Sequence, residues 1–410
     1  MLNEQQGQYI SGTSGSVTYG KIFIVFSDTG AGHRSAAEAI KKGIFELCSQ
    51  AGQLRPEIVM RDVIDKSNEL NHLFEQMYNR LLRTHEDWMK YYIDLIEWIK
   101  PNESEFGYQL VKKYAEGLIK EVNPAVIVSV HPMVNHFLAR TLKDLGLAGK
   151  VKLITVLTDP NAELWTGWAC PDADLTIAPN DLARDRLISL GLNSATIKVI
   201  GMPISPEFLR PPTESRKVLL SKLGLNPDIV TIAISAGSAG GGNMPAIYRA
   251  LGKVRKPVQV IFLCGKNKKL EAEMELASQE CQLRTVVLAY ATAVADGMNA
   301  CDLLVTKAGG LTTFEAIARR LPMAFDLLTE PMPQEAGTVK LLIDAGLAKP
   351  IYRPDDILPI AESLSVVTGR QNLPLPAAHN LNCVDAVYEI ARLILNLASP
   401  VNNGTSSSSG

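Results

Sequence analysis

The stretch IVFSDTGAGHRSAAEAI, residues 24–40, decides how the first part of this chain is expected to fold. Its β-branched and aromatic beginning is typical of a buried strand. Gly30 and Gly32 then allow the backbone to turn sharply, and the alanine-rich run that follows favours a helix. We expect this helix to begin near Ser35, with its free N–H groups pointing beyond the end of the strand. Such a helix end favours anions or developing negative charge.

A histidine lies in this turn. The imidazole of His33 has an ordinary pKa near neutrality, so it could act as a general base at the end of the strand. The structural alternative is a tight turn between strand and helix in which Asp28 or Ser35 caps the helix. The turn lacks GxGxxG spacing, and no ribose-binding acid follows a second strand, so dinucleotide binding is not indicated.

Short β-branched runs alternate with helical stretches through the rest of the chain, which indicates parallel α/β layers. Because these runs are apolar throughout rather than alternating, we expect strands that are covered on both faces. The predicted strands are 21–26, 57–63, 125–130, 152–158, 175–179 and 197–201 in the first half, and 228–235, 258–264, 284–290, 302–307 and 322–327 in the second.

A proline-rich break, PISPEFLRPPTESRK (203–217), separates the two halves. We therefore predict an α/β protein with two doubly wound parallel-sheet domains, whose ligands bind where the carboxyl ends of the strands face a central cleft. The helix at 385–398 is long enough to pack back on the first domain. The predicted parts are a disordered tail (1–19), a first domain (20–205), a linker (206–217), a second domain (218–384) and a second disordered tail (399–410).

Composition narrows the classes of function. The 41 basic and 43 acidic residues nearly balance, so a basic face that binds nucleic acid is not expected. The six cysteines are scattered without a CxxC pair, which favours reduced core residues in a cytoplasmic protein over a zinc site. The polar first twenty residues do not resemble a signal peptide, and no apolar run reaches the ~18 residues that span a bilayer.

A second strand–glycine–helix pattern, DLLVTKAGGLTTFEAIARRLPMAF, occupies residues 302–325. Glu315 falls one turn into its helix, where a carboxylate can accept hydrogen bonds from both hydroxyls of a ribose. The alternative for Glu315 is a favourable interaction with the helix dipole, worth ~0.3–1 kcal/mol. The residues at the turn itself are Lys307, Gly309, Gly310 and Thr312.

Two further segments of the second half carry polar or small residues. Gln334 and Glu335 lie in a predicted loop ahead of another helix, where amide and carboxylate groups suit sugar hydroxyls or form a solvated cap. The segment SAGSAGGGN (235–243) follows a predicted strand. Its backbone amides could cradle a phosphate, or its glycines could simply form a flexible loop.

Residues 70–99 combine aromatic and aliphatic side chains at helical spacing. One interpretation is a membrane-facing helical region, in which Trp and Tyr lie at the interface. The other is a buried helical core. Basic residues do not outnumber acidic ones in the stretch, which weakens attraction to anionic lipid.

Three motifs resemble those of one known family. SDTGAGHRSAAEAI resembles the N-terminal signature of the monogalactosyldiacylglycerol synthase group, which also includes bacterial processive diacylglycerol glucosyltransferases. KAGGLTTFEA, followed by PMPQEAGTV, resembles the nucleotide-sugar half of the same group. The resemblance covers roughly residues 20–398, and the order and separation of the motifs make it specific. It implies the GT-B fold, in which two Rossmann-like domains enclose the active site.

The resemblance implies a UDP-sugar site held mainly by the second domain. Glu315 matches the glutamate that holds ribose, and Gln334 and Glu335 match the pair that reaches the donor sugar. Uracil would be read by the backbone near Tyr290 and Ala291. The residues that match the turn and the glycine loop near the phosphates are Gly237, Ser238, Gly240, Lys307, Gly309, Gly310 and Thr312.

On the acceptor side, His33 matches the histidine beside the reaction centre, and Asp28 and Asp159 are candidates to position or tune it. The other residues assigned to this side are Gly30, Gly32, His131, Trp88 and Tyr92.

The chain departs from the family pattern at two places. Many relatives have three consecutive glycines before the histidine, but Ala31 interrupts them here. Relatives also often have a histidine shortly after a Thr–Asp pair, whereas Thr158 and Asp159 are followed by none before Trp168. The identity of the acceptor and the local catalytic details depend on these positions.

These observations predict a hexosyltransferase that moves a hexose from a UDP-sugar to a lipid hydroxyl, with diacylglycerol as the expected acceptor. No DxD-type motif is evident, so neither a metal nor another cofactor is expected. A lipid acceptor implies a cytoplasmic protein that associates peripherally with a membrane surface. The alternatives are transfer to a polyprenyl-linked or other acceptor, 2-epimerisation of a UDP-sugar, and a non-catalytic UDP-binding module.

Overall fold

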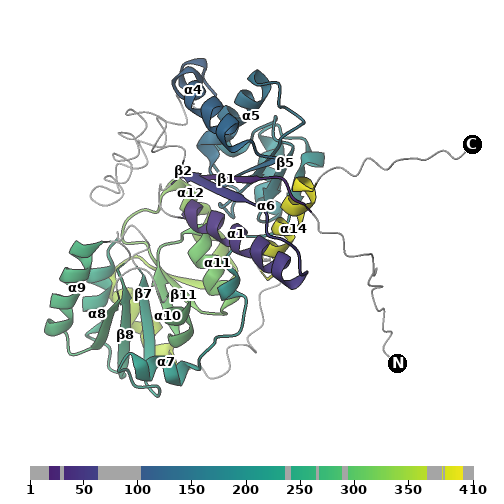
Figure 1. Ribbon diagram of the computed structural model, residues 1–410. Helices are drawn as coiled ribbons and strands as arrows, with labels where there is room; N and C mark the ends of the chain where they lie inside the picture. The colour runs from purple at the N-terminus through teal and green to yellow at the C-terminus, as the bar shows by residue number, and fades with distance from the viewer. Residues whose placement is uncertain are drawn as a thin grey trace, which may run out of the picture.

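The computed structural model contains two six-stranded parallel sheets with helices packed against them (Figure 1). The two α/β units lie one above the other in this view, and α1 and α11 lie between them. The predicted fold class is therefore confirmed. The structure describes residues 18–27, 32–62, 103–235, 242–264, 267–288, 294–366, 381 and 384–399.

The first sheet has the strand order β2-β1-β3-β4-β5-β6, and every neighbouring pair is parallel. All residues of β1 and β3 are buried, as their continuous apolar runs predict. Each strand falls within its predicted range. The bounds are β1 Ile22–Phe26, β2 Ile58–Asp62, β3 Val126–Ser129, β4 Lys152–Val156, β5 Leu175–Ala178 and β6 Ile197–Val199.

The second sheet has the order β12-β11-β10-β7-β8-β9 and is parallel throughout. The sequence predicts all of its strands except β12, an edge strand that contains a proline and whose two middle residues are not buried. The bounds are β7 Val230–Ser235, β8 Val258–Leu263, β9 Arg284–Leu288, β10 Leu303–Thr306, β11 Met323–Asp326 and β12 Ala348–Ile351.

Each sheet has one point at which the strand order reverses. In the first sheet this point lies between β1 and β3, and in the second it lies between β7 and β10. Ligands of open parallel sheets bind outside the carboxyl ends of the strands at such a point, because the two following segments diverge to opposite faces there. The topology therefore selects the segments after β1, β3, β7 and β10 as the walls of a site.

Two helix starts differ from the predictions. Helix α1 begins at Gly32 rather than near Ser35, so His33 lies in its first turn. Gln334 and Glu335 lie in the first turn of α12, not in a loop before it. The helices are α1 Gly32–Gln50, α4 Glu105–Val122, α5 Asn135–Asp144, α6 Asp181–Ser189, α7 Arg216–Lys222, α8 Met244–Leu251, α9 Lys268–Glu280, α10 Val294–Ala300, α11 Gly310–Ala318, α12 Pro333–Asp344, α13 Ile357–Ser363 and α14 Ala386–Ala398.

The last helix, α14, packs against α1 and β3 of the first unit (Figure 1). Gly43 of α1 allows this close approach, because a β-carbon there would lie 3.1 Å from Cγ2 of Val387. The hydroxyl of Tyr388 donates to Glu46 of α1 at 2.8 Å. The chain thus returns from the second unit to the first through α14.

One hydrophobic cluster extends across both units and includes Ile40 of α1 and Phe314 of α11. The cysteines at 48, 170, 264 and 301 are buried and free, in line with their assignment to the core. None of the helices in the described ranges has the length and apolarity needed to cross a bilayer. The predicted tails lie almost wholly outside the described residues.

Candidate active site

His33 lies at the point where the order of the first sheet reverses. It follows β1, and its Nδ1 contacts the backbone oxygen of Val130, directly after β3, at 2.7 Å. A carbonyl oxygen can only accept, so Nδ1 carries the proton and Nε2 carries the lone pair. Oγ1 of Thr158, after β4, lies 3.2 Å from the same Nδ1. The segments after three neighbouring strands therefore fix the tautomer of this imidazole.

Two aromatic side chains surround the imidazole of His33. The ring of His131 meets it edge-on, with centroids 4.4 Å apart and an interplanar angle of 68°. The indole of Trp168 lies 6.3 Å away between centroids. Burial lowers the pKa of His33 to about 4, although the hydrogen bond to Val130 opposes the shift. At neutral pH the imidazole is therefore neutral and able to accept a proton.

His131, which the sequence assigns to the acceptor side, is buried beside His33. Its Nδ1 accepts a hydrogen bond from the backbone N–H of Met133 at 3.3 Å, at the start of the short 3-10 helix Pro132–Val134. Burial, reinforced by His33, holds the pKa of His131 well below its ordinary value. Two neutral imidazoles of opposite tautomer thus lie edge to face.

Asp159 follows β4 and joins the same group. The indole N–H of Trp168 donates to its Oδ2 at 2.6 Å. Burial raises the pKa of Asp159 to about 6, and this hydrogen bond opposes the shift. The carboxylate also lies close enough to Glu335 of the second unit to raise that residue's pKa. Asp159 therefore faces the second unit from the first.

Lys307 occupies the matching position in the second sheet, directly after β10. Burial lowers its pKa, whereas Glu335 and Asp326 favour the protonated ammonium. Burial likewise raises the pKa of Glu335, with Lys307 opposing the shift. Lys307, Glu335 and Asp326 thus form a charged group at the reversal point of the second sheet.

Gly242 completes this group at the end of the glycine-rich segment. Its φ of +102° lies in the region that favours glycine. A β-carbon there would lie 2.8 Å from Cε of Lys307 and 3.0 Å from Oδ2 of Asp326. The next residue, Asn243, donates its backbone N–H to that same carboxylate oxygen at 2.8 Å. Asp326 thus fixes the glycine-rich segment against Lys307.

The start of α11 provides the other wall at this point. Gly309 is its N-cap, and a β-carbon on Gly309 would lie 4.0 Å from Oε1 of Glu335. Gly310 and Thr312 lie in the first turn, where backbone N–H groups have no partner within the helix. This helix end adds a partial positive charge beside Lys307, which suits an anion such as a diphosphate.

Glu315 lies further along α11. Burial and the neighbouring Glu207 raise its pKa to about 8, and Lys42 of α1 opposes the shift. Lys42 forms an ion pair with Glu207 at 3.3 Å, which links α1 to the segment that connects the two units. Glu315 thus lies among groups of α1 and the connecting segment, whereas Glu335 lies among those of Lys307 and Asp159.

Several predicted site residues lie outside the described residues. They are Asp28, Gly30, Trp88, Tyr92, Gly237, Ser238, Gly240, Tyr290 and Ala291.

Sequence reasoning missed Trp168, which donates to Asp159, and three residues at or beyond the ends of strands. Thr158 contacts His33, Asp326 holds the segment beside Lys307, and Asn161 connects the two units. Their shared signal is position, because each lies at or just beyond the carboxyl end of a buried strand. Gln334 instead meets the first unit, because its backbone oxygen accepts from Asn161, whereas its neighbour Glu335 interacts with Lys307.

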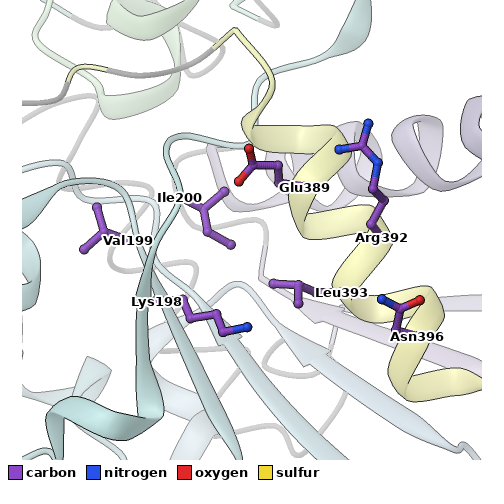
Figure 2. A pocket seen from close by; sticks show the side chains of 7 residues that line it. All are labelled: Lys198, Val199, Ile200, Glu389, Arg392, Leu393 and Asn396. Carbon is purple, nitrogen blue, oxygen red and sulfur yellow. The ribbon is translucent and has the colours of Figure 1, made fainter. Parts of the chain in front are cut away.

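A separate hollow of about 390 Å³ lies between the end of β6 and α14, where Figure 2 shows Lys198, Glu389 and Arg392 around it. None of the predicted site residues lines it. We therefore do not assign it to the reaction. Within the described residues, no group of three or more His, Cys, Asp or Glu side chains is placed to hold a metal ion.

The arrangement of two parallel-sheet units, with facing reversal points, defines the class of GT-B proteins. The fold is similar to that of MurG of Acinetobacter baumannii, with a TM-score of 0.55, 15% identity and coverage of 92% of this chain and 99% of that chain. It is also similar to the UDP-GlcNAc 2-epimerase of Methanocaldococcus jannaschii, with a TM-score of 0.53, 13% identity and coverage of 91% and 99%. At these identities the likeness establishes the fold.

Sequence comparison identifies the family within this class. Residues 33–204 match the family model of monogalactosyldiacylglycerol (MGDG) synthase, and residues 232–327 match the C-terminal domain of glycosyltransferase family 28. Monogalactosyldiacylglycerol synthase 3 of Arabidopsis thaliana is 31% identical over 337 residues, which cover 79% of this chain and 70% of the relative. The chain belongs to the monogalactosyldiacylglycerol synthase family.

A second relative is the monogalactosyldiacylglycerol synthase of Spinacia oleracea, 32% identical over 359 residues. The match covers 82% of this chain and 64% of the spinach protein. The chain therefore spans less than two thirds of the length of this relative. Both relatives are named as chloroplastic proteins.

Proposed function

We propose that this protein transfers a hexose from a UDP-sugar to the hydroxyl of diacylglycerol. The observation that carries the proposal is the placement of His33, whose Nδ1 donates to the backbone oxygen of Val130 and leaves Nε2 as the basic nitrogen. The family of the protein supports the choice of donor and acceptor, because the relatives are named as monogalactosyldiacylglycerol synthases.

In the proposed reaction, Nε2 of His33 takes the proton of the acceptor hydroxyl while the hydroxyl oxygen attacks C1 of the hexose. The bond between C1 and the diphosphate oxygen breaks, and UDP leaves with the electron pair. A neutral imidazole is suited to this step, because it is already deprotonated at neutral pH. Asp159 accepts a hydrogen bond from Trp168, whose ring lies 6.3 Å from that of His33, and we propose that its ionised carboxylate favours the imidazolium that forms.

The second unit would hold the donor. Lys307 and the N-terminus of α11 supply positive charge at the place proposed for the diphosphate. Glu315 would accept hydrogen bonds from the ribose, and Gln334 and Glu335, in the first turn of α12, would hold the hexose. Because the leaving charge is met by these groups, we propose that the chemistry needs no bound metal ion or other cofactor.

A lipid acceptor would bring the protein to a membrane surface, so we propose peripheral association. We propose a cytoplasmic location for this chain, although both relatives are named as chloroplastic, and fractionation of its host cells tests the compartment.

The test is release of UDP from UDP-galactose, UDP-glucose and UDP-N-acetylglucosamine, each with and without diacylglycerol micelles. The proposal predicts release that depends on the lipid and favours one donor. Release without lipid, or conversion of the donor to its 2-epimer, would contradict it.

A further inference from the structure

The loop at residues 158–161 leaves the carboxyl end of β4 and is fixed within the first unit at two points. Nδ2 of Asn180 donates to the backbone oxygen of Pro160 at 2.7 Å, while Oδ1 of Asn180 caps α6 through Ala183. The indole of Trp168 donates to Asp159. The loop is therefore a rigid projection from the first unit toward the second.

The loop packs against two helices of the second unit, and in each helix the contact lies at a glycine. A β-carbon on Gly310 of α11 would lie 2.4 Å from the backbone oxygen of Thr158. A β-carbon on Gly337 of α12 would lie 2.6 Å from Oδ1 of Asn161. Neither glycine has a positive φ. Glycine within a helix costs about 0.5–1 kcal/mol relative to alanine, so close approach of the loop accounts for both positions.

Asn161 makes the polar contacts across this junction. Its Nδ2 donates to the backbone oxygen of Gln334 and to Oγ1 of Thr338, both at 2.9 Å. Its Oδ1 accepts from the backbone N–H of Glu163 at 2.8 Å. The side chain is 1% exposed. The buried amide therefore has hydrogen-bond partners for both its nitrogen and its oxygen. Because breaking these bonds would be costly, the amide favours one relative position of the two units.

We infer that the loop at residues 158–161 acts as a latch that holds the two units together and that Asn161 is a positioning residue for the reaction. The latch places Asp159 of the first unit opposite Glu335, which follows Gln334 directly in α12. It also holds the loop that contacts His33 against the start of α11. This inference rests on the proposed function for its catalytic consequence, but the latch itself is a structural property that can be measured without turnover.

The test compares three variants of the full chain with a matched control. Asn161→Ala removes the amide, Thr338→Val removes one of its acceptors, and Gly337→Ala forces the amide away. Gly117→Ala in α4 is the control, because a β-carbon there meets nothing within 4 Å. Hydrogen–deuterium exchange reports opening at 158–163 and 333–338, calorimetry gives the affinity for UDP, and steady-state assays give kcat and KM.

We expect exchange in both segments to rise about tenfold in Asn161→Ala, the effect of losing one buried hydrogen-bonding group. The affinity for UDP should stay within about twofold, because the groups proposed to hold UDP belong to the second unit, while kcat falls about tenfold. Thr338→Val and Gly337→Ala should change the same quantities in the same direction, and Gly117→Ala should change none.

Two results would overturn the inference. One is that Thr338→Val and Gly337→Ala keep the hydrogen–deuterium exchange and the kcat of the wild type. These two variants also test the latch if Asn161→Ala does not fold. The other is equal loss of UDP affinity and kcat, which would mean general damage rather than loss of a latch. A wild-type protein without lipid-dependent turnover would refute the proposed function alone, because exchange and UDP affinity would still report the latch.

Discussion

Nδ1 of His33 lies 2.7 Å from the backbone oxygen of Val130, and this contact assigns the basic lone pair to Nε2. The two residues are far apart in the sequence and meet because β1 and β3 are neighbours in the sheet. The imidazole therefore cannot rotate to present Nδ1 without giving up a buried hydrogen bond.

Removal of this imidazole tests its role as base. We expect His33→Ala to lower kcat by roughly 100-fold or more, the usual contribution of a general base, with UDP affinity unchanged. Steady-state kinetics over a range of pH gives kcat for each variant. His136→Ala is the control, because His136 is not among the residues placed around His33. Near-wild-type kcat in His33→Ala would remove His33 from the mechanism.

Burial raises the pKa of Asp159, and the hydrogen bond from Trp168 opposes that rise. Loss of the indole N–H in Trp168→Phe removes a hydrogen bond that favours the carboxylate, so the pKa of Asp159 should rise above about 6. If the ionised carboxylate supports catalysis, activity falls as pH drops through this pKa, and the acidic limb should move to higher pH in the variant. A limb that stays in place would show that Asp159 is not the titrating group.

Ionisation of Glu315 should make the affinity for UDP depend on pH. Its pKa, raised to about 8 by burial and Glu207, means that the neutral form predominates at pH 7. A ribose diol favours the ionised form, so binding of UDP should tighten as pH rises from about 7 to about 9, where the phosphates of UDP are already ionised. Calorimetry on wild type and Glu315→Gln tests this. The variant should show no such dependence, and a flat wild-type profile would contradict the assignment.

Lys307 is expected to hold the diphosphate. Lys307→Met should weaken UDP binding by about tenfold to a hundredfold, the effect of losing a charged hydrogen-bonding partner. Lys340→Met is the control, since Lys340 is 76% exposed and pairs with Asp344 on the same helix, α12. Equal affinities in the two variants would exclude Lys307 from the donor site.

The proposed metal independence can be checked by dialysis against a chelator. Because Lys307 and the start of α11 meet the leaving charge, lipid-dependent turnover should remain within about twofold of the untreated rate. Loss of turnover that magnesium restores would show that the diphosphate needs a cation as well.

The sequence predicted the sheets well because parallel strands are buried on both faces and appear as continuous apolar runs. The exception, β12, is an edge strand whose proline and unburied middle residues break that pattern. Helix starts were less accurate: α1 begins earlier than expected, at Gly32, because glycine does not prevent a first helical turn. The strand order, and with it the two reversal points, follows from long-range pairing that local patterns do not contain.

The same limit applies to the site. His33 and Lys307 could be found as motifs, since Lys307 follows β10 directly and His33 lies in the turn-and-helix pattern after β1. Asn161 could not, because its partners Gln334 and Thr338 belong to the other unit and nothing in the local sequence pairs them. Gly310 appeared only as a turn glycine and Gly337 was not singled out, and the packed loop explains both.

The most direct measurement of the central claim is identification of the lipid product. Purified protein is incubated with a UDP-hexose labelled in the sugar and with diacylglycerol micelles, and the lipids are separated and analysed by mass spectrometry, with His33→Ala in parallel. The account predicts a labelled monohexosyldiacylglycerol and an equal amount of UDP from the wild type, and a greatly reduced amount of both from the variant. Bound UDP without any labelled lipid, for all three UDP-sugars, would contradict it.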